Sequence, residues 1–199
     1  MNTQVRWVCK SDLWQMAGDA TMAIAPSPQQ NKARIRRLID EAFAGVRLGA
    51  GLSLRAARAR DACPGELDPA DFVALAEPEV VDDWHAVPLA ELEHARVFHL
   101  DPLGFRYYIP ALLLSVLDRY DGCAMRSVAT LAALYPRPGA WELFQYRYSA
   151  LNDAQRSAIA CFLEVLPDVI DLWAEDALLA TSALHNYWGR YLPDTAGHY

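Results

Sequence analysis

Residues 98–120 read FHLDPLGFRYYIPALLLSVLDRY and form the most apolar long stretch of the chain. The pair Asp101-Pro102 is typical of a helix start, because an Asp side chain accepts backbone N–H bonds and Pro fits the first helical position. The apolar residues that follow lie on nearly every side of such a helix, which predicts burial on most sides. Pro110 removes one backbone hydrogen bond and is expected to kink the helix. The stretch therefore predicts a central helix against which the rest of the chain packs.

Further helices are predicted on both sides of this stretch, most of them behind a residue that can accept backbone N–H bonds. The expected helices, with their capping residues, are 28–44 (Ser27), 54–62 (Ser53), 70–76 (Asp68), 89–95, 127–135, 153–166 (Asn152) and 169–187 (Asp168). Asn152 and Gln155 have the spacing of a capping box. Pro167 is expected to end the helix that this box begins.

Two short segments leave room for β-structure. Residues 141–149, WELFQYRYS, place aromatic side chains at alternate positions, which is compatible with a strand, and a helix stays open for so short a run. Residues 4–10 also fit a short strand. We therefore expect a mainly α fold: a single compact helical domain over 28–199, preceded by an N-terminal extension over 1–27, with at most a minor β element.

Charge is distributed unevenly along the 199 residues, whose net charge is −7. Residues 1–60 carry ten Lys and Arg against four Asp and Glu, whereas residues 61–104 carry eleven acids and one base, Arg96. In one interpretation the two parts neutralise each other across the fold. In the other, the protein presents an acidic face to a basic partner.

The cysteines and the hydropathy pattern indicate an intracellular protein. Cys9, Cys63, Cys123 and Cys161 are far apart and contain no C-x-x-C pair, so we expect reduced thiols and neither a disulfide framework nor a zinc site. No apolar run is long enough for a membrane span, and the N-terminus lacks the pattern of a secretory signal. These features predict a cytoplasmic location.

Catalytic motifs are absent from the sequence. Glu91 and His94 lie at E-x-x-H spacing, as do Asp82 and His85, but Pro88 separates the two pairs, and di-metal bundles need such pairs on long facing helices. There is no G-x-S-x-G elbow, Walker loop or dinucleotide glycine motif. We therefore expect no metal and no cofactor. The arginines of 34–60 could form a phosphate-binding patch, but the overall acidity argues against nucleic acid.

Four stretches together resemble a family of small bacterial proteins catalogued only as a domain of unknown function. They are AFAGVRLG (42–49), DDWHAVP (82–88), FHLDPLGFRYYIPALLL (98–114) and SALNDAQRSAIACFLEVL (149–166). The resemblance covers roughly residues 31–192, and the D-P-x-G-x-R-Y-Y-x-P helix that begins at Asp101 is its most specific part. Leu112 departs from the pattern, which has an aromatic residue after Pro-Ala. The resemblance implies a mainly helical fold and implies no activity.

Two hypotheses of function follow from these observations. In the first, the chain is a non-enzymatic protein-binding protein, such as an immunity protein that neutralises a bacterial toxin, and it contacts a basic partner through an acidic surface. The candidate surface residues are Asp82, Asp83, Trp84, Glu91 and Glu93. In the alternative, the chain is an enzyme whose site is assembled from scattered residues, of which the candidates are Asp82, Asp83, His85, His94 and His99.

Overall fold

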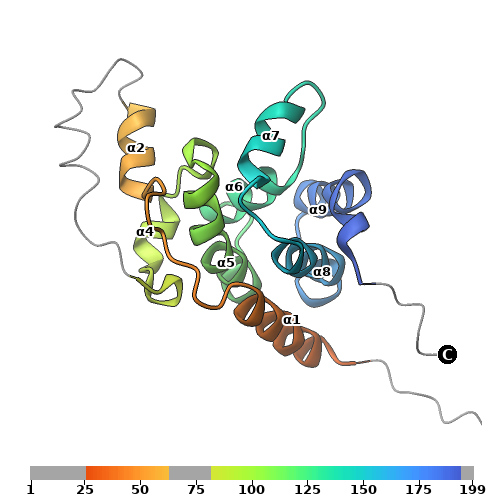
Figure 1. Cartoon of the computed structure of the whole chain (residues 1–199). Helices are drawn as coiled ribbons and strands as arrows, with labels where there is room; N and C mark the ends of the chain where they lie inside the picture. Colours follow the sequence, from red (N-terminus) through yellow and green to blue (C-terminus); the bar gives the residue numbers. More distant parts are fainter. Residues whose placement is uncertain (1–25, 63–81, 194–199) are drawn as a thin grey trace, which may run out of the picture.

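The computed structural model describes residues 26–62 and 82–193, and over these two ranges the chain forms helices and no strand (Figure 1). The predicted mainly α fold is confirmed for this part of the chain. Within the same ranges no helix combines the length and the apolar composition that a membrane crossing requires. The expected strand over 4–10 and the expected helix over 70–76 lie outside the described residues.

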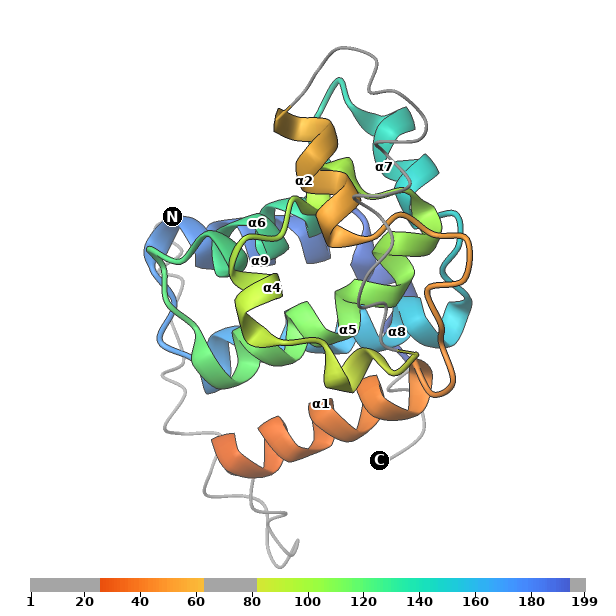
Figure 2. The same cartoon turned by 90° about the vertical axis from the view of Figure 1, so that its left-hand side faces the viewer.

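The predicted central helix is α5, Pro102–Arg119, and it occupies the middle of the molecule (Figures 1 and 2). Twelve of its 18 residues are buried, which explains why its sequence is apolar on nearly every side. Around it pack four helices and one short 3-10 turn: α1 (Pro28–Ala42), α4 (Leu89–Glu93), α6 (Met125–Leu134), α7 (Trp141–Tyr148) and η2 (Trp84–Ala86).

A second layer is built on α8, Asp153–Val169, which packs against α1 and against α9, Ala174–Asn186. The 3-10 turn η4, Trp188–Tyr191, lies on α8 and α9. Trp188 of η4 ties this layer to α6, because its Nε1 donates to the Leu134 carbonyl at 2.7 Å, and Tyr148 Oη of α7 donates to the neighbouring Ala133 carbonyl at 2.7 Å. Their polar atoms are thus satisfied inside the core.

The start of α5 is joined to the loop that precedes α2, Leu54–Ala62. Asp101 Oδ1 accepts hydrogen bonds from the backbone N–H of Gly104 at 2.8 Å and from that of Leu52 at 2.9 Å. A Cβ on Gly104 would overlap the Leu52 carbonyl oxygen, and one on Gly51 would overlap the first turn of α5. We call these four residues, Gly51, Leu52, Asp101 and Gly104, the Asp101 joint.

Helices α1, α2 and α8 begin where their capping residues predict. Ser27 and Asn152 both form complete capping boxes, and Ser53 Oγ accepts a hydrogen bond from the Ala56 N–H at 3.1 Å. Each bond satisfies a backbone donor that has no partner inside its helix. The turn η3, Val97–His99, precedes the joint and packs against α2 and α6.

In the C-terminal half, the alternative left open over 141–149 is resolved, and two expectations were wrong. Residues 141–148 form a helix, because Phe144 and Tyr148, four residues apart, are both buried against the core; the alternation of aromatic residues was no sign of a strand. Helix α8 continues through Pro167 to Val169, since a proline in the last turn removes only one backbone hydrogen bond. Asp168 therefore lies within α8, and the last helix begins at Ala174 without a side-chain cap.

Gly104→Ala tests the close approach at the joint. Replacing a glycine by alanine inside a helix ordinarily adds about 0.5–1 kcal/mol of stability. Here the new Cβ would meet the backbone carbonyl of Leu52, which cannot move without displacing the loop. We expect a net loss of about 1–3 kcal/mol in the free energy of unfolding, measured by urea titration.

Gly122→Ala is the matched control for this prediction. Its Cβ would meet the side chain of Trp173, which is exposed and free to turn away, so the loss should be smaller. An equal or larger loss for Gly122→Ala would contradict the account of the joint.

Candidate functional site

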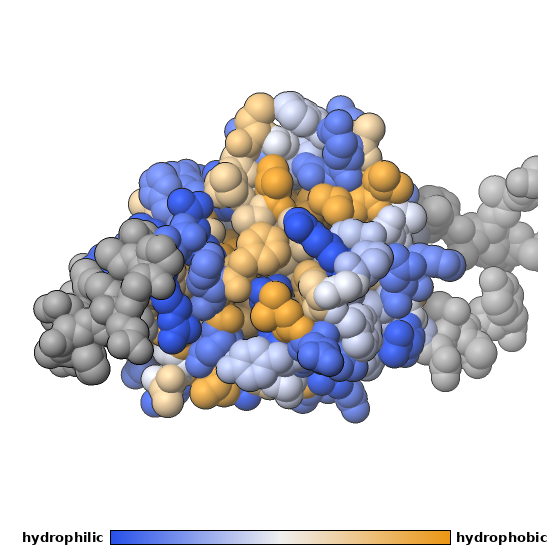
Figure 3. All heavy atoms as spheres, turned by 90° about the horizontal axis from the view of Figure 1, so that it is seen from above, coloured by the Kyte–Doolittle hydropathy of each residue, from blue (hydrophilic) through white to orange (hydrophobic). Residues whose placement is uncertain are grey.

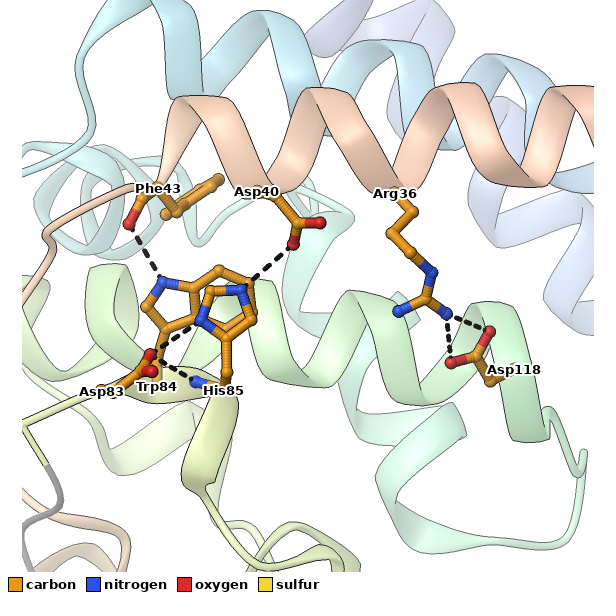
Figure 4. Close-up of polar contacts among 7 residues, drawn as sticks. All are labelled: Arg36, Asp40, Phe43, Asp83, Trp84, His85 and Asp118. Carbon is orange, nitrogen blue, oxygen red and sulfur yellow. Dashed lines mark hydrogen bonds and ion pairs between the residues drawn. The ribbon is translucent and has the colours of Figure 1, made fainter.

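A cavity of about 280 Å³ lies between α1, η2, α4 and α5, next to the acidic section of the sequence. Its floor is mostly apolar and includes Trp84, Leu92 and Ala111. Its rim is charged and includes Arg36, His85, Asp118 and Arg119. Figure 4 shows the polar contacts that surround it.

Trp84 holds the η2 turn against α1. Its side chain is only 2% exposed, and its Nε1 donates to the Phe43 carbonyl at 3.0 Å (Figure 4). The His85 ring stacks on the Trp84 ring with 3.6 Å between centroids. The expectation that Trp84 is a surface residue that anchors a partner needs correction, because its indole is already inside the core. Its role is to fix the position of the neighbouring residues 82, 83 and 85.

His85 bridges two carboxylates. Its Nδ1 lies 2.7 Å from Asp83 Oδ1, and its Nε2 lies 3.2 Å from Asp40 Oδ1 on α1 (Figure 4). Asp83 Oδ1 also accepts the His85 backbone N–H at 3.0 Å and thereby caps η2. A catalytic histidine uses one ring nitrogen for an orienting carboxylate and the other for the reacting group. Since both nitrogens of His85 face carboxylates, the ring connects η2 to α1 and has no nitrogen available for a substrate.

On the opposite side of the cavity, Arg36 of α1 pairs with Asp118 of α5. The Arg36 Nη2 to Asp118 Oδ1 distance is 2.6 Å (Figure 4). Both side chains are more than a third exposed, so this pair adds little to stability. The cavity rim is thus closed by two polar bridges from α1, one through His85 and one through Arg36.

The candidate acidic residues fall into two groups. Glu91 is paired inside the protein: it lies 3.3 Å from Arg55 and also contacts Arg58, and its side chain is only 26% exposed. Asp82 and Asp83 are 81% and 65% exposed, and Asp82 reaches Arg47 only at 4.0 Å. Glu93 is intermediate, with Arg126 at 3.6 Å. The acidic and basic sections of the sequence therefore neutralise each other at Glu91, whereas the carboxylates of Asp82 and Asp83 stay largely exposed despite their contacts with Arg47 and His85.

The residues of the enzyme hypothesis do not converge on one place. Asp82 faces Arg47, His85 faces Asp40 and Asp83, and His99 Nε2 lies 3.1 Å from Asp61 on α2. His94 forms the C-terminal cap of α4. Over residues 26–62 and 82–193, no three His, Cys, Asp or Glu side chains are arranged to hold a metal ion.

The pKa values of three tyrosine and cysteine side chains are raised, which makes these groups less reactive. Burial raises the pKa of Tyr107 to about 12, and burial together with a hydrogen bond to Asp176 raises that of Tyr120 to about 12. Burial also raises the pKa of the Cys161 thiol. A nucleophile or general base needs a pKa near the working pH, whereas these groups stay protonated.

Several residues at the cavity carried no sequence signal for a site. Asp40 and Asp118 lie on separate helices 78 positions apart, and each looks like an ordinary charge on an exposed helix face. Arg36 stood out only as one of a group of arginines. The contact of the Trp84 indole with the Phe43 carbonyl joins residues 41 positions apart, and only the packing of α1 on α5 reveals it.

Comparison with known proteins gives one result. Residues 31–192 match the model of a family described as "Family of unknown function (DUF6714)". The chain belongs to this family. The resemblance inferred from the four sequence stretches is therefore confirmed, and the match brings no activity with it. No curated protein and no solved structure matches the chain.

The Asp83 contacts predict a specific dependence of stability on pH. Hydrogen bonds from the His85 backbone and ring hold the pKa of Asp83 below its ordinary value of 3.8. A carboxylate whose pKa is lowered on folding stabilises the folded state above its unfolded pKa, and this contribution is lost as the pH falls through the folded value. Asp83→Asn keeps an oxygen that can accept the backbone N–H but removes the charge.

We therefore expect wild type to be more stable than Asp83→Asn at about pH 7, with the difference shrinking below about pH 3.8. Urea unfolding of both proteins across this range measures the difference. A constant difference at all pH values would show that the Asp83 charge has no special stabilising contacts.

Proposed function

We propose that this protein is a non-enzymatic, cytoplasmic binding protein that docks a basic protein partner on Asp82 and Asp83, which we call the acidic edge, with Glu93 as a further exposed carboxylate. The observation that carries the proposal is the anchoring of the η2 turn. Buried Trp84 fixes this turn to the Phe43 carbonyl, while the two carboxylates that precede it are largely exposed. Charged groups held in one position bind at a lower entropic cost than groups on a flexible loop.

The acidic edge is a smaller set than the sequence suggested. Glu91 is engaged by Arg55 and Arg58, and removing it from them would leave two guanidinium groups without their carboxylate. Trp84 does not contact the partner; it holds the η2 turn in place. The remaining side chains lie where a Lys or Arg of a partner can reach them and speed encounter by electrostatic attraction.

Within this proposal, the finer role is that of an immunity protein that neutralises a basic toxin. A net charge of −7 and the absence of catalytic motifs from the sequence support such a role. The scattered placement of the histidines and the lack of a metal-binding cluster in the described ranges are consistent with it.

Site-specific cross-linking tests the acidic edge. A photoreactive amino acid at position 82 should capture a basic protein in the native host, and the same residue at position 153 should not. Asp153 is a good control because it is an exposed aspartate on α8, away from the edge. Equal capture at both positions, or none at position 82, would contradict the proposal.

Charge reversal then measures the contribution of Asp82. Asp82→Lys should slow association with the captured partner by about tenfold and weaken its dependence on salt. Asp153→Lys makes the same change in net charge and should leave the rate nearly unchanged. The melting temperatures of both variants should stay close to wild type, because both carboxylates are exposed.

Co-expression tests the immunity role separately. The captured partner should arrest growth when produced alone, and this chain should restore growth. If the captured partner does not arrest growth, the immunity role is wrong, and the proposal of protein binding still stands.

A further inference from the structure

Arg147 of α7 is a buried arginine whose guanidinium is only partly hydrogen-bonded. The residue is 1% exposed, and over the described ranges no acidic side chain pairs with it. One guanidinium nitrogen, Nη2, donates to the Phe98 carbonyl at 3.0 Å, whereas Nε and Nη1 have no hydrogen-bond partner. Burial lowers the pKa of the group. Buried charges in proteins are ordinarily paired, so this arrangement lacks an anion.

Two other inward-facing arginines, Arg126 and Arg156, each have the carboxylate partner that Arg147 lacks among the described residues. Arg126 lies 3.6 Å from Glu93 and donates to the Arg119 carbonyl, and Arg156 lies 3.6 Å from Asp153 and donates to the Tyr148 carbonyl. Each of them leaves only Nε without a partner. Arg147 leaves two nitrogens unsatisfied and is the more deeply buried of the three.

Two aromatic rings lie against this guanidinium, and one of them is partly exposed. Its carbon atom lies 5.3 Å from the centres of both the Phe98 and the Phe144 rings. Phe98 is 39% exposed and lies 6.0 Å from a second guanidinium, that of Arg137. Leu143 is 52% exposed and precedes Arg147 by four residues, so it is on the same side of α7. In Figure 3, which views the end of the molecule that carries α2 and α7, hydrophobic residues gather in the middle of this face inside a hydrophilic border.

We propose that Phe98, Leu143 and Arg147 form a docking site for a protein segment that presents a carboxylate next to an apolar side chain. The carboxylate supplies the missing partner of Arg147 Nε and Nη1, and Arg137 adds to the attraction. The apolar side chain covers Leu143 and the exposed edge of Phe98. Rotation of the Phe98 ring, which lies over the guanidinium, gives the carboxylate access.

The net charge of the protein favours a carboxylate-bearing protein segment over a nucleic acid as the ligand of this site. A nucleic acid would face the net charge of −7 and would gain nothing from exposed apolar side chains. A single carboxylate flanked by apolar groups matches both features of the site. The site is independent of the acidic edge, since it selects a partner group of the opposite charge.

A carboxylate placed on the protein itself tests whether Arg147 lacks a partner. In Leu143→Glu, the new side chain stands four residues before Arg147, the favourable order for an ion pair on a helix. We expect the melting temperature to rise by about 2–4 °C relative to Leu143→Gln, which has nearly the same shape but no charge. Equal melting temperatures for these two variants would overturn the proposal. Because Leu143 is half exposed, both variants should fold.

A small probe tests recognition from outside. N-acetylphenylalanine carries a carboxylate beside an aromatic group, and N-acetylphenylalaninamide is its neutral match. In NMR titrations, the carboxylate should shift the Arg147 Nε–Hε resonance of the full chain, and the amide should bind at least about tenfold more weakly. Leu143→Glu should abolish the shift, because its own carboxylate occupies the guanidinium. Equal shifts from the two probes, or no shift from the carboxylate, would overturn the proposal.

Discussion

The fold depends on one carboxylate that holds two segments together. Asp101 Oδ1 accepts the N–H of Gly104 in the first turn of α5 and the N–H of Leu52 in the loop before α2. Because backbone N–H groups at a helix start have no partner within the helix, an Asp at this position would cap any helix. Here it also fixes the direction in which α5 enters the core, and the lack of a side chain on Gly104 lets the two backbones meet. Helices α1, α4, α6 and α7 pack against α5, and α8 and α9 form the second layer.

The charges of the chain follow the same architecture. Six arginines of the basic first section lie on α1 and α2, and Glu91 and Glu93 of the acidic section lie on α4; the fold brings Arg36 to Asp118 of α5, and Arg55 and Arg58 to Glu91. Among the described residues, part of the charge asymmetry is therefore neutralised by internal ion pairs. Two groups of the described residues are left over: the exposed carboxylates before Trp84, and the buried guanidinium of Arg147, which pairs with no carboxylate of residues 26–62 or 82–193. The two binding proposals rest on these groups: a basic partner would contact the carboxylates, and a partner with a carboxylate would contact Arg147.

Local signals in the sequence predicted most of the fold and little of the site. Asp101, Ser53 and Asn152 could be identified as caps because a cap involves residues within three or four positions. The segment of 141–148 was ambiguous because eight residues are too few to separate periods of 2 and 3.6, and its packing on α5 decides for a helix. Trp84 was predicted at the surface, since only the distant Phe43 carbonyl shows that its indole is satisfied inside. The missing partner of Arg147 was equally invisible, because the absence of a contact appears only in three dimensions.

The stability of Asp101→Ala tests the central claim most directly. Loss of an ordinary cap costs about 1 kcal/mol, and Asn152→Ala, which removes the acceptor of the Gln155 N–H at the start of α8, provides that reference. Asp101→Ala also leaves the Leu52 N–H without its acceptor, which adds about 1–3 kcal/mol. The account predicts that urea unfolding gives a loss of about 2–4 kcal/mol for Asp101→Ala, clearly more than for Asn152→Ala. Equal losses in the two variants would show that Asp101 is only a helix cap and would contradict the account.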